Sequence, residues 1–486
     1  MTTTFDDAYW SRQRELLIID PDIRHVSFAQ FVADQCAHEL RHVQHVGWYR
    51  WNGHIWEATG DDGAAMQAVT DAARVLMMRG AEHSGDIAWC SAASSKMLVN
   101  HQRRAMVSEM AVLPQFRATV DELDAQRRLL TFRNGTVDLR TGELHAHDPA
   151  DMLTQTANVD YVPDAESPRW LRFVEEVFPG DADMQRYYQT FLGMAITGEV
   201  REHALGVWYG EHGRNGKGTT IRTMQKVFGH DVVHEVPFTI FENVRGQAVH
   251  TEQIAALRGK RLVVAQEGNQ GVPMNVALLK NLSGGDRIST RHLHGKVFSF
   301  DPTFTIVLAT NYQPEFGSGG AALWARTKAM LFGVSFADRR DSDLEPTIQG
   351  PEREGVAAWV VRGAVRYYAE GLRDTLSVIA ATEHHKDEVD PLKPLIGEVF
   401  DYDDDSEVKR SDFNRALKEW CQDNGDTSAK FKPGNVKNHL KTNGVAEVQR
   451  KGKGWMYRGV YLLSDPPAHI VKAEASGPGI FDQTRR

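Results

Sequence analysis

The segment HALGVWYGEHGRNGKGTTIRTMQKVFG (203–229) most restricts the folds open to this chain. An apolar, strand-forming run at 203–210 leads directly into a glycine-rich loop, and a helical pattern at 219–229 follows, closed by Gly229. Such a loop binds phosphate when its backbone N–H groups and the helix N-terminus point at the anion. The order strand, loop, helix therefore predicts an α/β fold with a nucleotide-phosphate site at the loop.

The loop departs at two positions from the standard pattern G-x-x-x-x-G-K-[ST]. Glu211 stands where the first glycine is expected, and the nearest glycine, Gly210, comes one residue early. Gly218 follows Lys217 in place of a hydroxyl residue, and Thr219 comes next. We expect Lys217 to reach the β- and γ-phosphates, with a cofactor-binding loop formed by Gly213, Asn215, Gly216, Lys217, Gly218, Thr219 and Thr220. The alternative is a flexible turn that binds nothing.

Two further apolar strands, predicted at 259–268 and 303–309, each lead to a polar side chain. Glu267 ends the first, where an ATPase places its water-activating or metal-orienting group, and Asn311 follows the second, where an amide orients the attacking water. Each residue alone fits an ordinary strand end or turn. Together with Lys217, they predict three functional groups at successive strand ends of one parallel sheet.

The flanking regions differ in character from this core. Residues 1–125 are predicted to be mainly helical, with an aromatic hairpin turning at Asn52-Gly53. Its tryptophans either form a stacking surface or, as we expect with more weight, pack on one another. A second region is predicted at 126–200. It begins with short strands joined by the Asn134-Gly135 and Thr141-Gly142 turns and continues with helices at 167–200. The ATPase core is predicted at 201–350 and a helical lid or linker at 351–400.

The C-terminal part has a different charge balance. Residues 408–463 hold 12 Lys and Arg against 5 Asp and Glu, although the whole chain has a net charge of −9. Two predicted helices followed by a basic hairpin indicate a winged-helix-like DNA-binding domain, with Lys451 and Lys453 as DNA contacts. The acidic run DYDDDSEV (401–408) is interpreted as a linker before it, and residues 464–486 as a loose tail.

A hairpin is also predicted in RHLHGKVFSF (291–300), between the second and third strands of the core. Its tip carries His292, His294 and Lys296. A solvated tip is one interpretation, and contact with DNA phosphates is the other. A metal site at the two histidines is disfavoured because the sequence offers no third ligand.

Composition excludes several classes of protein. The 486 residues are 41% hydrophobic and 25% charged, which is typical of globular domains. The three cysteines lie far apart and form neither a metal-ligand pattern nor a disulfide framework, so we expect a cytoplasmic location. No apolar run is long enough to span a membrane, and we expect no membrane partner.

Several motifs resemble those of the superfamily 3 helicases of the poxvirus-type and the phage- and plasmid-type primase-helicases, and they follow one another in the same order as in that family. They are NGTVDLRTGEL, FLGMAITGE, YGEHGRNGKGTT, RLVVAQEG, the segment ALLKNLSGGDRISTRHLHGKVFSFDPTFTIVLATNYQP, and LWARTKAMLF. The resemblance extends over residues 125–463. It implies an AAA+-like P-loop ATPase with a parallel sheet flanked by helices, which uses ATP and Mg²⁺, assembles as a ring, usually a hexamer, and translocates on DNA.

The resemblance also implies roles for particular residues. Lys217 matches the phosphate-binding lysine, Glu267 the acid of the second strand, and Asn311 the sensor asparagine. Gln266 replaces one member of the acidic pair found in many such ATPases, so Thr219 and Glu267 are the tentative Mg²⁺ ligands. The family's WRRIR-like segment stands here as WARTK, which leaves Arg326 as the catalytic finger acting on a neighbouring subunit, with Lys328 as a second cation.

The implied partners are single-stranded and forked DNA, other copies of the chain, and a separate primase or replication protein. The hairpin residues His294 and Lys296 match the family's DNA-tracking hairpin. Many relatives carry a primase domain upstream, but residues 1–125 show no paired metal-binding carboxylates, so we expect no primer synthesis. Two alternatives remain open: an ATP-switched replication initiator that binds an origin, and a P-loop kinase or metabolic enzyme.

Overall fold

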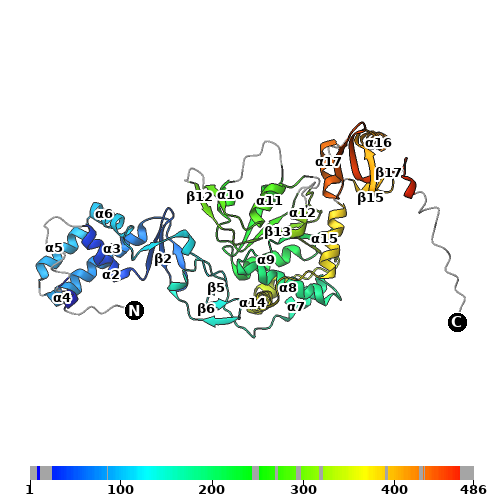
Figure 1. Cartoon of the computed structure of the whole chain (residues 1–486). Helices are drawn as coiled ribbons and strands as arrows, with labels where there is room; N and C mark the ends of the chain where they lie inside the picture. Colours follow the sequence, from blue (N-terminus) through cyan, green and yellow to red (C-terminus); the bar gives the residue numbers. More distant parts are fainter. Residues whose placement is uncertain are drawn as a thin grey trace.

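The computed structural model describes residues 8–10, 12, 25–84, 86–243, 251–268, 272–291, 297–316, 321–388, 392–425, 431 and 433–470. Three parts follow one another along the chain (Figure 1): an N-terminal helical part, a central α/β part and a small C-terminal part. The central part is the largest, and both of its neighbours attach to it at opposite ends in this view.

A five-stranded parallel sheet organises the central part, in the order β14-β8-β13-β10-β9. Every residue of β8 and β13 is buried, as expected for apolar runs covered on both faces. The prediction of a parallel α/β sheet is confirmed, although only three of the five strands were predicted. The strands are β8 (Leu205–Tyr209), β9 (Val233–Pro237), β10 (Leu262–Gln266), β13 (Thr305–Thr310) and β14 (Thr327–Leu331).

Two hydrophobic clusters cover the two faces of this sheet. On one face, Trp208 and Val307 pack with residues of α7, α8, α9 and α14. On the other, Val207 and Leu308 pack with residues of α11 and α12 and against α15. The bounds are α7 (Pro168–Val177), α8 (Ala182–Thr197), α9 (Lys217–Phe228), α10 (Thr251–Ala255), α11 (Val276–Ser283), α12 (Ala321–Arg326), α13 (Leu344–Gln349), α14 (Arg353–Glu370) and α15 (Leu376–Glu388).

The strand order creates a switch point between β8 and β13. The chain leaves β8 toward β9, at one edge of the sheet, and leaves β13 toward β14, at the other edge. Connections that diverge from two neighbouring strands open a crevice outside their carboxyl ends, where ligands of open α/β sheets bind. The glycine loop follows β8, and Asn311 follows β13, so both lie at this crevice.

The N-terminal part is mainly helical with an aromatic hairpin, as predicted. Trp48 and Trp56 are buried, and Trp51 lies 5.8 Å from Trp56 between ring centroids, so these rings pack within the domain. The Trp56 indole also donates to the carbonyl of Pro149 at 2.8 Å. The elements are α2 (His25–Cys36), β1 (Leu40–Val43), β2 (Gly47–Trp51), β3 (Trp56–Ala58), α3 (Gly63–Val75), α4 (Ala81–Ser84), α5 (Ile87–Met97), α6 (Asn100–Met110) and β4 (Arg117–Ala118).

A buried arginine joins the next region to the sheet. Antiparallel strands β5 (Leu129–Phe132), β6 (Gly135–Asp138) and β7 (Glu143–His145) form the predicted short sheet. The guanidinium of Arg261, just before β10, donates to the carbonyls of Arg127, Leu129 and Ile196 and to Gln155 Oε1. Satisfying this buried cation ties the short sheet and the end of α8 to the central sheet.

The C-terminal part corrects one boundary. The acidic run at 401–408 is not a linker: it lies within strand β15 (Phe400–Lys409), which pairs antiparallel with β17 (Gly454–Leu462). Strand β16 (Ala446–Arg450) completes a three-stranded sheet, and α16 (Arg410–Asp423) and α17 (Pro433–Thr442) separate β15 from the hairpin. The two helices and the basic hairpin are present as predicted, and their winged-helix identity stays a prediction.

Two other expectations concern residues 291–300 and 351–400. Strands β11 (Ile288–Arg291) and β12 (Val297–Phe300) form the arms of the predicted hairpin, while its tip, 292–296, lies outside the described residues. Helix α14, assigned to a separate lid, packs in the main core beside α8. Within the described residues, no helix combines the length and apolar composition needed to span a membrane.

Candidate nucleotide site

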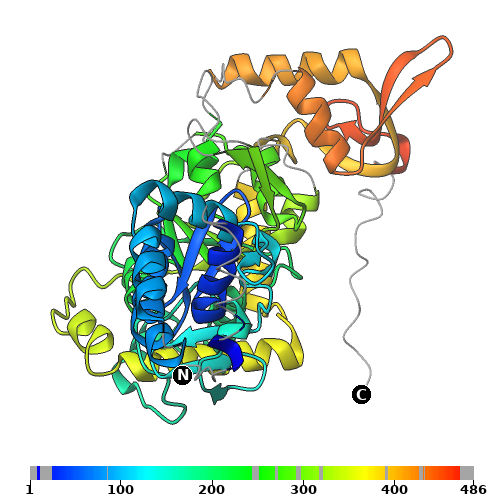
Figure 2. The same ribbon diagram turned by 90° about the vertical axis from the view of Figure 1, so that its left-hand side faces the viewer.

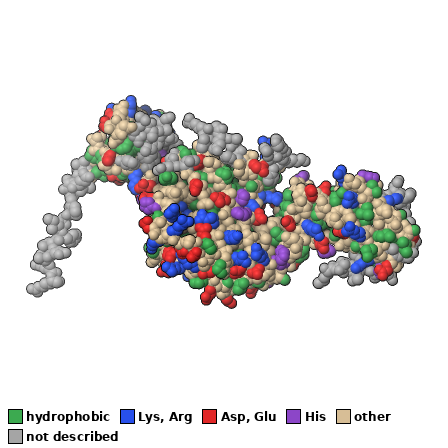
Figure 3. Space-filling view, turned by 180° about the vertical axis from the view of Figure 1, so that it is seen from behind, with side chains coloured by type: hydrophobic (Ala, Val, Ile, Leu, Met, Phe, Trp, Pro, Cys, Tyr) green, Lys and Arg blue, Asp and Glu red, His purple; other side chains and the backbone are tan. Residues whose placement is uncertain are grey.

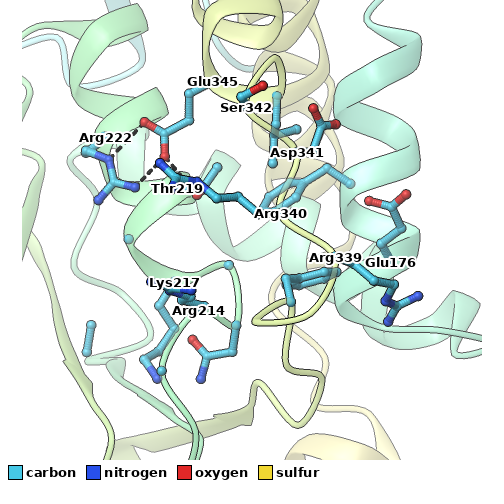
Figure 4. Close-up of a pocket in the computed structure, with 18 of the residues that line it drawn as sticks. Glu176, Arg214, Lys217, Thr219, Arg222, Arg339, Arg340, Asp341, Ser342 and Glu345 are labelled. Carbon is cyan, nitrogen blue, oxygen red and sulfur yellow. Dashed lines mark hydrogen bonds and ion pairs between the residues drawn. The ribbon is translucent and has the colours of Figure 1, made fainter.

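A cavity of about 950 Å³ lies at the carboxyl ends of β8, β10 and β13. Its volume is within the ~300–1,000 Å³ typical of small-molecule sites. Lys217, Glu267 and Asn311, predicted from three strand ends, all line it (Figure 4 shows the side of the loop and α9). The expected cofactor loop contributes Gly213, Asn215, Gly216, Gly218 and Thr219 to the same wall.

Packing explains the early glycine of the loop. A Cβ at Gly210 would lie 2.3 Å from the carbonyl oxygen of Phe332 and 2.7 Å from Asn215 Nδ2, so no larger residue fits without movement. Asn215 is buried, and its Nδ2 donates to the carbonyl of His212 at 2.7 Å, which closes the loop. Gly216 has φ of 97°, a left-handed conformation that favours glycine, directly before α9.

Lys217 begins α9 and points into the cavity. Its Nζ donates to Asn311 Oδ1 at 3.2 Å, which joins the loop after β8 to the residue after β13. The residue is 7% exposed, and burial lowers the pKa of its ammonium to about 8. Within the described residues no carboxylate lies at ion-pair distance from its ammonium, which faces the cavity.

Glu267 has a strained backbone and an exposed side chain. Its φ is 62°, unusual for a residue other than glycine, and its N–H donates to the carbonyl of Ala309 at 3.2 Å. The preceding Gln266 donates instead to Glu235 Oε1 at 2.8 Å. The backbone turn thus presents the Glu267 carboxylate at the cavity. Strain of this kind is concentrated at functional sites.

The two threonines after Gly218 point in different directions. Thr219 lines the cavity, and its hydroxyl donates to Glu345 Oε1 at 3.0 Å. Thr220 is fully buried: it accepts from the Tyr188 hydroxyl at 2.7 Å and donates to the carbonyl of Gly216 at 3.1 Å. Thr220 therefore supports the loop from the core. Its side chain does not line the cavity, although it was expected to contact the cofactor.

Glu345 is a cavity residue that sequence patterns missed. It lies in the first turn of α13 and forms a bidentate pair with Arg222 of α9 in addition to accepting from Thr219 (Figure 4). The Arg222 guanidinium lowers the pKa of this carboxyl below its usual range. Together with Glu267 and Thr219, it offers the oxygen ligands that Mg²⁺ prefers. Among the described residues, no group of three or more His, Cys, Asp or Glu side chains is placed so that it could hold a metal ion.

Basic residues from two other segments complete the cavity wall. Arg169 donates to Asp341 Oδ2 at 2.9 Å and to Glu176 Oε2 at 3.2 Å, yet its Nη1 is buried without a partner within the described residues. The run ADRRDSDLEP (337–346) brings further charges across from α7. Seven cations and four acids line the cavity, so its walls carry a formal +3: Arg169, Arg172, Arg214, Lys217, Arg222, Arg339 and Arg340 against Glu176, Glu267, Asp341 and Glu345.

The two cations expected to act on a neighbouring subunit lie away from this cavity. Arg326 ends α12, and its Nη1 donates to the carbonyl of Lys280 at 2.8 Å and to Ser283 Oγ at 3.2 Å. Lys328 on β14 forms an ion pair with Asp374 at 2.6 Å. Both therefore have partners within their own chain, and neither lines the site of this chain.

The expected DNA contacts are partly within the described residues. Lys451 and Lys453 lie, exposed, in the turn between β16 and β17. His292, His294 and Lys296 lie outside the described residues. Figure 3 shows Lys and Arg side chains interspersed with Asp and Glu on the face of the central part that it draws.

Comparison with known proteins gives two family matches. Residues 29–179 match the model described as "D5 N terminal like". This match begins well before residue 125, the position at which the motifs recognised in the sequence start. Residues 208–321, which include the glycine loop, β10 and β13, match one described as "Family of unknown function (DUF5906)".

Individual relatives are viral. A protein of Invertebrate iridescent virus 6, provisionally named a helicase, is 28% identical over 46% of this chain and 24% of its own length. A protein of Acanthamoeba polyphaga mimivirus, also provisionally named a helicase, is 22% identical over 65% of this chain and 35% of its own length. A protein of African swine fever virus, provisionally named a primase, is 23% identical over 51% of this chain and 26% of its own length. The chain thus matches about a quarter to a third of the length of these relatives.

A solved structure, the apo C-terminal region of NrS-1, is 13% identical and covers 63% of this chain and 78% of its own. Its TM-score of 0.37 is too low to support a conclusion. The family and sequence matches agree with the resemblance found in the motifs: over part of its length, this chain is similar to the D5 N-terminal-like family and to viral proteins provisionally named helicases and primases.

Proposed function

We propose that this chain is an ATP-dependent DNA helicase of superfamily 3 that acts in the replication of a phage, a plasmid or a similar mobile element. The observation that carries the proposal is the meeting of Lys217, Glu267 and Asn311 in one cavity at the switch point of the parallel sheet. Helicase-named relatives support the same class of activity. The function places the protein in the cytoplasm of its host cell.

The cavity supports ATP hydrolysis by a division of roles. Loop N–H groups and Lys217 bind the phosphates, and the α9 N-terminus adds positive potential. Glu267 accepts a proton from the attacking water, and Asn311 orients it while holding Lys217 in place. Mg²⁺ bound with ATP would supply charge neutralisation at the phosphates, and Glu267, Thr219 and Glu345 would hold it.

Assembly completes the site in this proposal. Copies of the chain form a ring, a hexamer by family resemblance, and Arg326 of one copy reaches the ATP of the next. Such a cation contributes ~10³–10⁵ in rate in other NTPases. Hydrolysis then moves the hairpin between β11 and β12, which contacts one DNA strand through Lys296 and His294. A separate primase or replication protein supplies primers.

Strand separation on a forked DNA of arbitrary sequence tests the proposal. A helicase displaces the strand with ATP and no origin sequence. An ATP-switched initiator, the alternative, binds or melts only a particular sequence, so displacement confined to one sequence would favour it.

A hairpin variant tests how ATP hydrolysis is coupled to movement. We expect Lys296→Ala to retain ATP hydrolysis and lose strand displacement, because only the DNA contact is removed. Displacement at the wild-type rate would contradict the role of the hairpin.

A further inference from the structure

One tryptophan is exposed where the other ten are not. All eleven tryptophans lie in the described residues, and Trp455 alone, at 43%, belongs to the exposed large hydrophobic side chains. An indole ring in water forfeits the stabilisation that burial of a large aromatic surface brings. This position therefore differs from all other tryptophans in the molecule, and folding does not account for it.

Its place on the sheet explains the exposure. Trp455 is the second residue of β17 and lies opposite Gln449 of β16. Tyr457, two residues on and on the same face, is buried against Phe413 with ring centroids 5.5 Å apart. Trp455 continues this face beyond the hydrophobic core, on the hairpin that extends away from the helices (Figure 2).

A cation lies over the ring. The guanidinium carbon of Arg410, the first residue of α16, lies 5.8 Å from the Trp455 ring centroid. Arg410 is itself held by Glu447 at 2.7 Å, and Lys437 pairs with the same carboxylate. The indole is thus contacted by an anchored side chain while much of its surface stays in solvent.

Two cations lie in the turn of the hairpin, close in sequence to Trp455. Lys451 and Lys453 are exposed, and within the described residues neither has a carboxylate at ion-pair distance. Arg450, by contrast, is paired with Glu407. A partner that contacts both the exposed indole and the two lysines carries negative charges at intervals, with flat aromatic groups between those charges.

We propose that Trp455 is a stacking site for an unpaired nucleobase of single-stranded DNA, with Lys451 and Lys453 at the adjoining phosphates. Every base has a π-face, so the contact tolerates any sequence. Paired bases inside a duplex have no free face, so the site distinguishes single strands and fork ends from closed duplex. The inference deepens the proposed function by naming a DNA contact outside the ATP cavity, and it depends on that function only for the choice of DNA as ligand.

The test compares full-length variants on a single strand containing 2-aminopurine, whose fluorescence falls when it stacks. We expect Trp455→Ala to weaken binding about tenfold or more and to lose the quenching, because one base-stacking contact is removed. Trp455→Phe retains a ring and most of both effects. Leu376→Ala, at the most exposed apolar side chain, 84%, is the matched control and binds as wild type. Circular dichroism verifies that each variant is folded.

Salt dependence separates the ring from the lysines. Trp455→Ala leaves the slope of log affinity against log salt unchanged, while each lysine-to-alanine change reduces its magnitude by about 0.7, the value for one phosphate contact on a single strand. Wild-type affinity and quenching in folded Trp455→Ala would overturn the proposal. An equal loss of affinity for a duplex closed at both ends would also overturn it, since no base face is free there.

The test is independent of the ATP site, because it is made without nucleotide. If Trp455→Ala binds normally while Lys217→Ala loses ATP hydrolysis, only the stacking site fails. If Trp455→Ala is impaired while Lys217→Ala hydrolyses ATP normally, the proposed ATPase fails and the stacking site stands.

Discussion

At the scale of single residues, the glycine loop departs from the standard pattern for reasons visible in its contacts. Gly210 lies one position early because the backbone of Phe332 passes where a side chain would be. Thr219 comes one residue after the position where the standard pattern has a hydroxyl residue, and its side chain donates to Glu345. Thr220 is turned into the core. The loop is therefore supported by neighbours at 332 and 345 that no local motif includes.

Two glycines of this loop provide a matched pair of variants. We expect Gly210→Ala to lower the free energy of unfolding by about 1–3 kcal/mol, as overpacking does, because its Cβ meets backbone at 2.3 Å. Gly213→Ala has no atom within 4 Å of the new Cβ and serves as the control. Urea denaturation measures both. Equal stability of the two variants would show that the close approach of Phe332 is wrong.

If the cavity binds ATP as proposed, we expect Lys217 to make nucleotide affinity dependent on pH. With a pKa of about 8 in the free protein, it is charged below pH 8 and loses its charge above. The phosphates of ATP bind the charged form, so we expect affinity for ATP to fall about twofold from pH 7 to 8 and by up to about tenfold per unit above, since phosphate groups themselves titrate near 6. A fluorescent ATP analogue measures this. Affinity that does not change between pH 8 and 9.5 would contradict the assignment.

At the scale of elements, apolar periodicity predicted much of the fold. The strands β8, β10 and β13, helix α9 and the aromatic hairpin followed from runs of apolar residues and turn residues. Strand β15 did not, because DYDDDSEV has the composition of a solvated linker and becomes a strand by pairing with β17. The charges at 337–346 could not be placed at the site either, since only the fold brings them to α7.

The side chain of Arg261 links the short antiparallel sheet and the end of α8 to the central sheet. Its buried guanidinium donates to four backbone carbonyls and to Gln155, so Arg261→Ala leaves these acceptors unsatisfied and should lower the free energy of unfolding by about 3–5 kcal/mol. Arg74→Ala, which removes only the surface ion pair with Asp71, should cost less than about 1 kcal/mol. Guanidinium denaturation of both variants gives the comparison, and similar midpoints would contradict the linking role.

At the scale of the whole molecule, the proposed ATP site needs two copies of the chain. Arg326 lies outside the cavity of its own chain and is held by α11. Lys217→Ala and Arg326→Ala should each be inactive alone. Mixed together, they should recover part of the ATPase activity, because some interfaces join an intact Lys217 to an intact Arg326. A mixture no more active than its components would place Arg326 outside the reaction.

In the proposed function, the cavity between β8 and β13 hydrolyses ATP through Lys217. The most direct measurement is the turnover number for ATP of the wild type, of Lys217→Ala and of Lys226→Ala, a control on the exposed side of the same helix. We predict that Lys217→Ala abolishes turnover while Lys226→Ala retains it. Turnover by Lys217→Ala equal to the wild type would contradict the account.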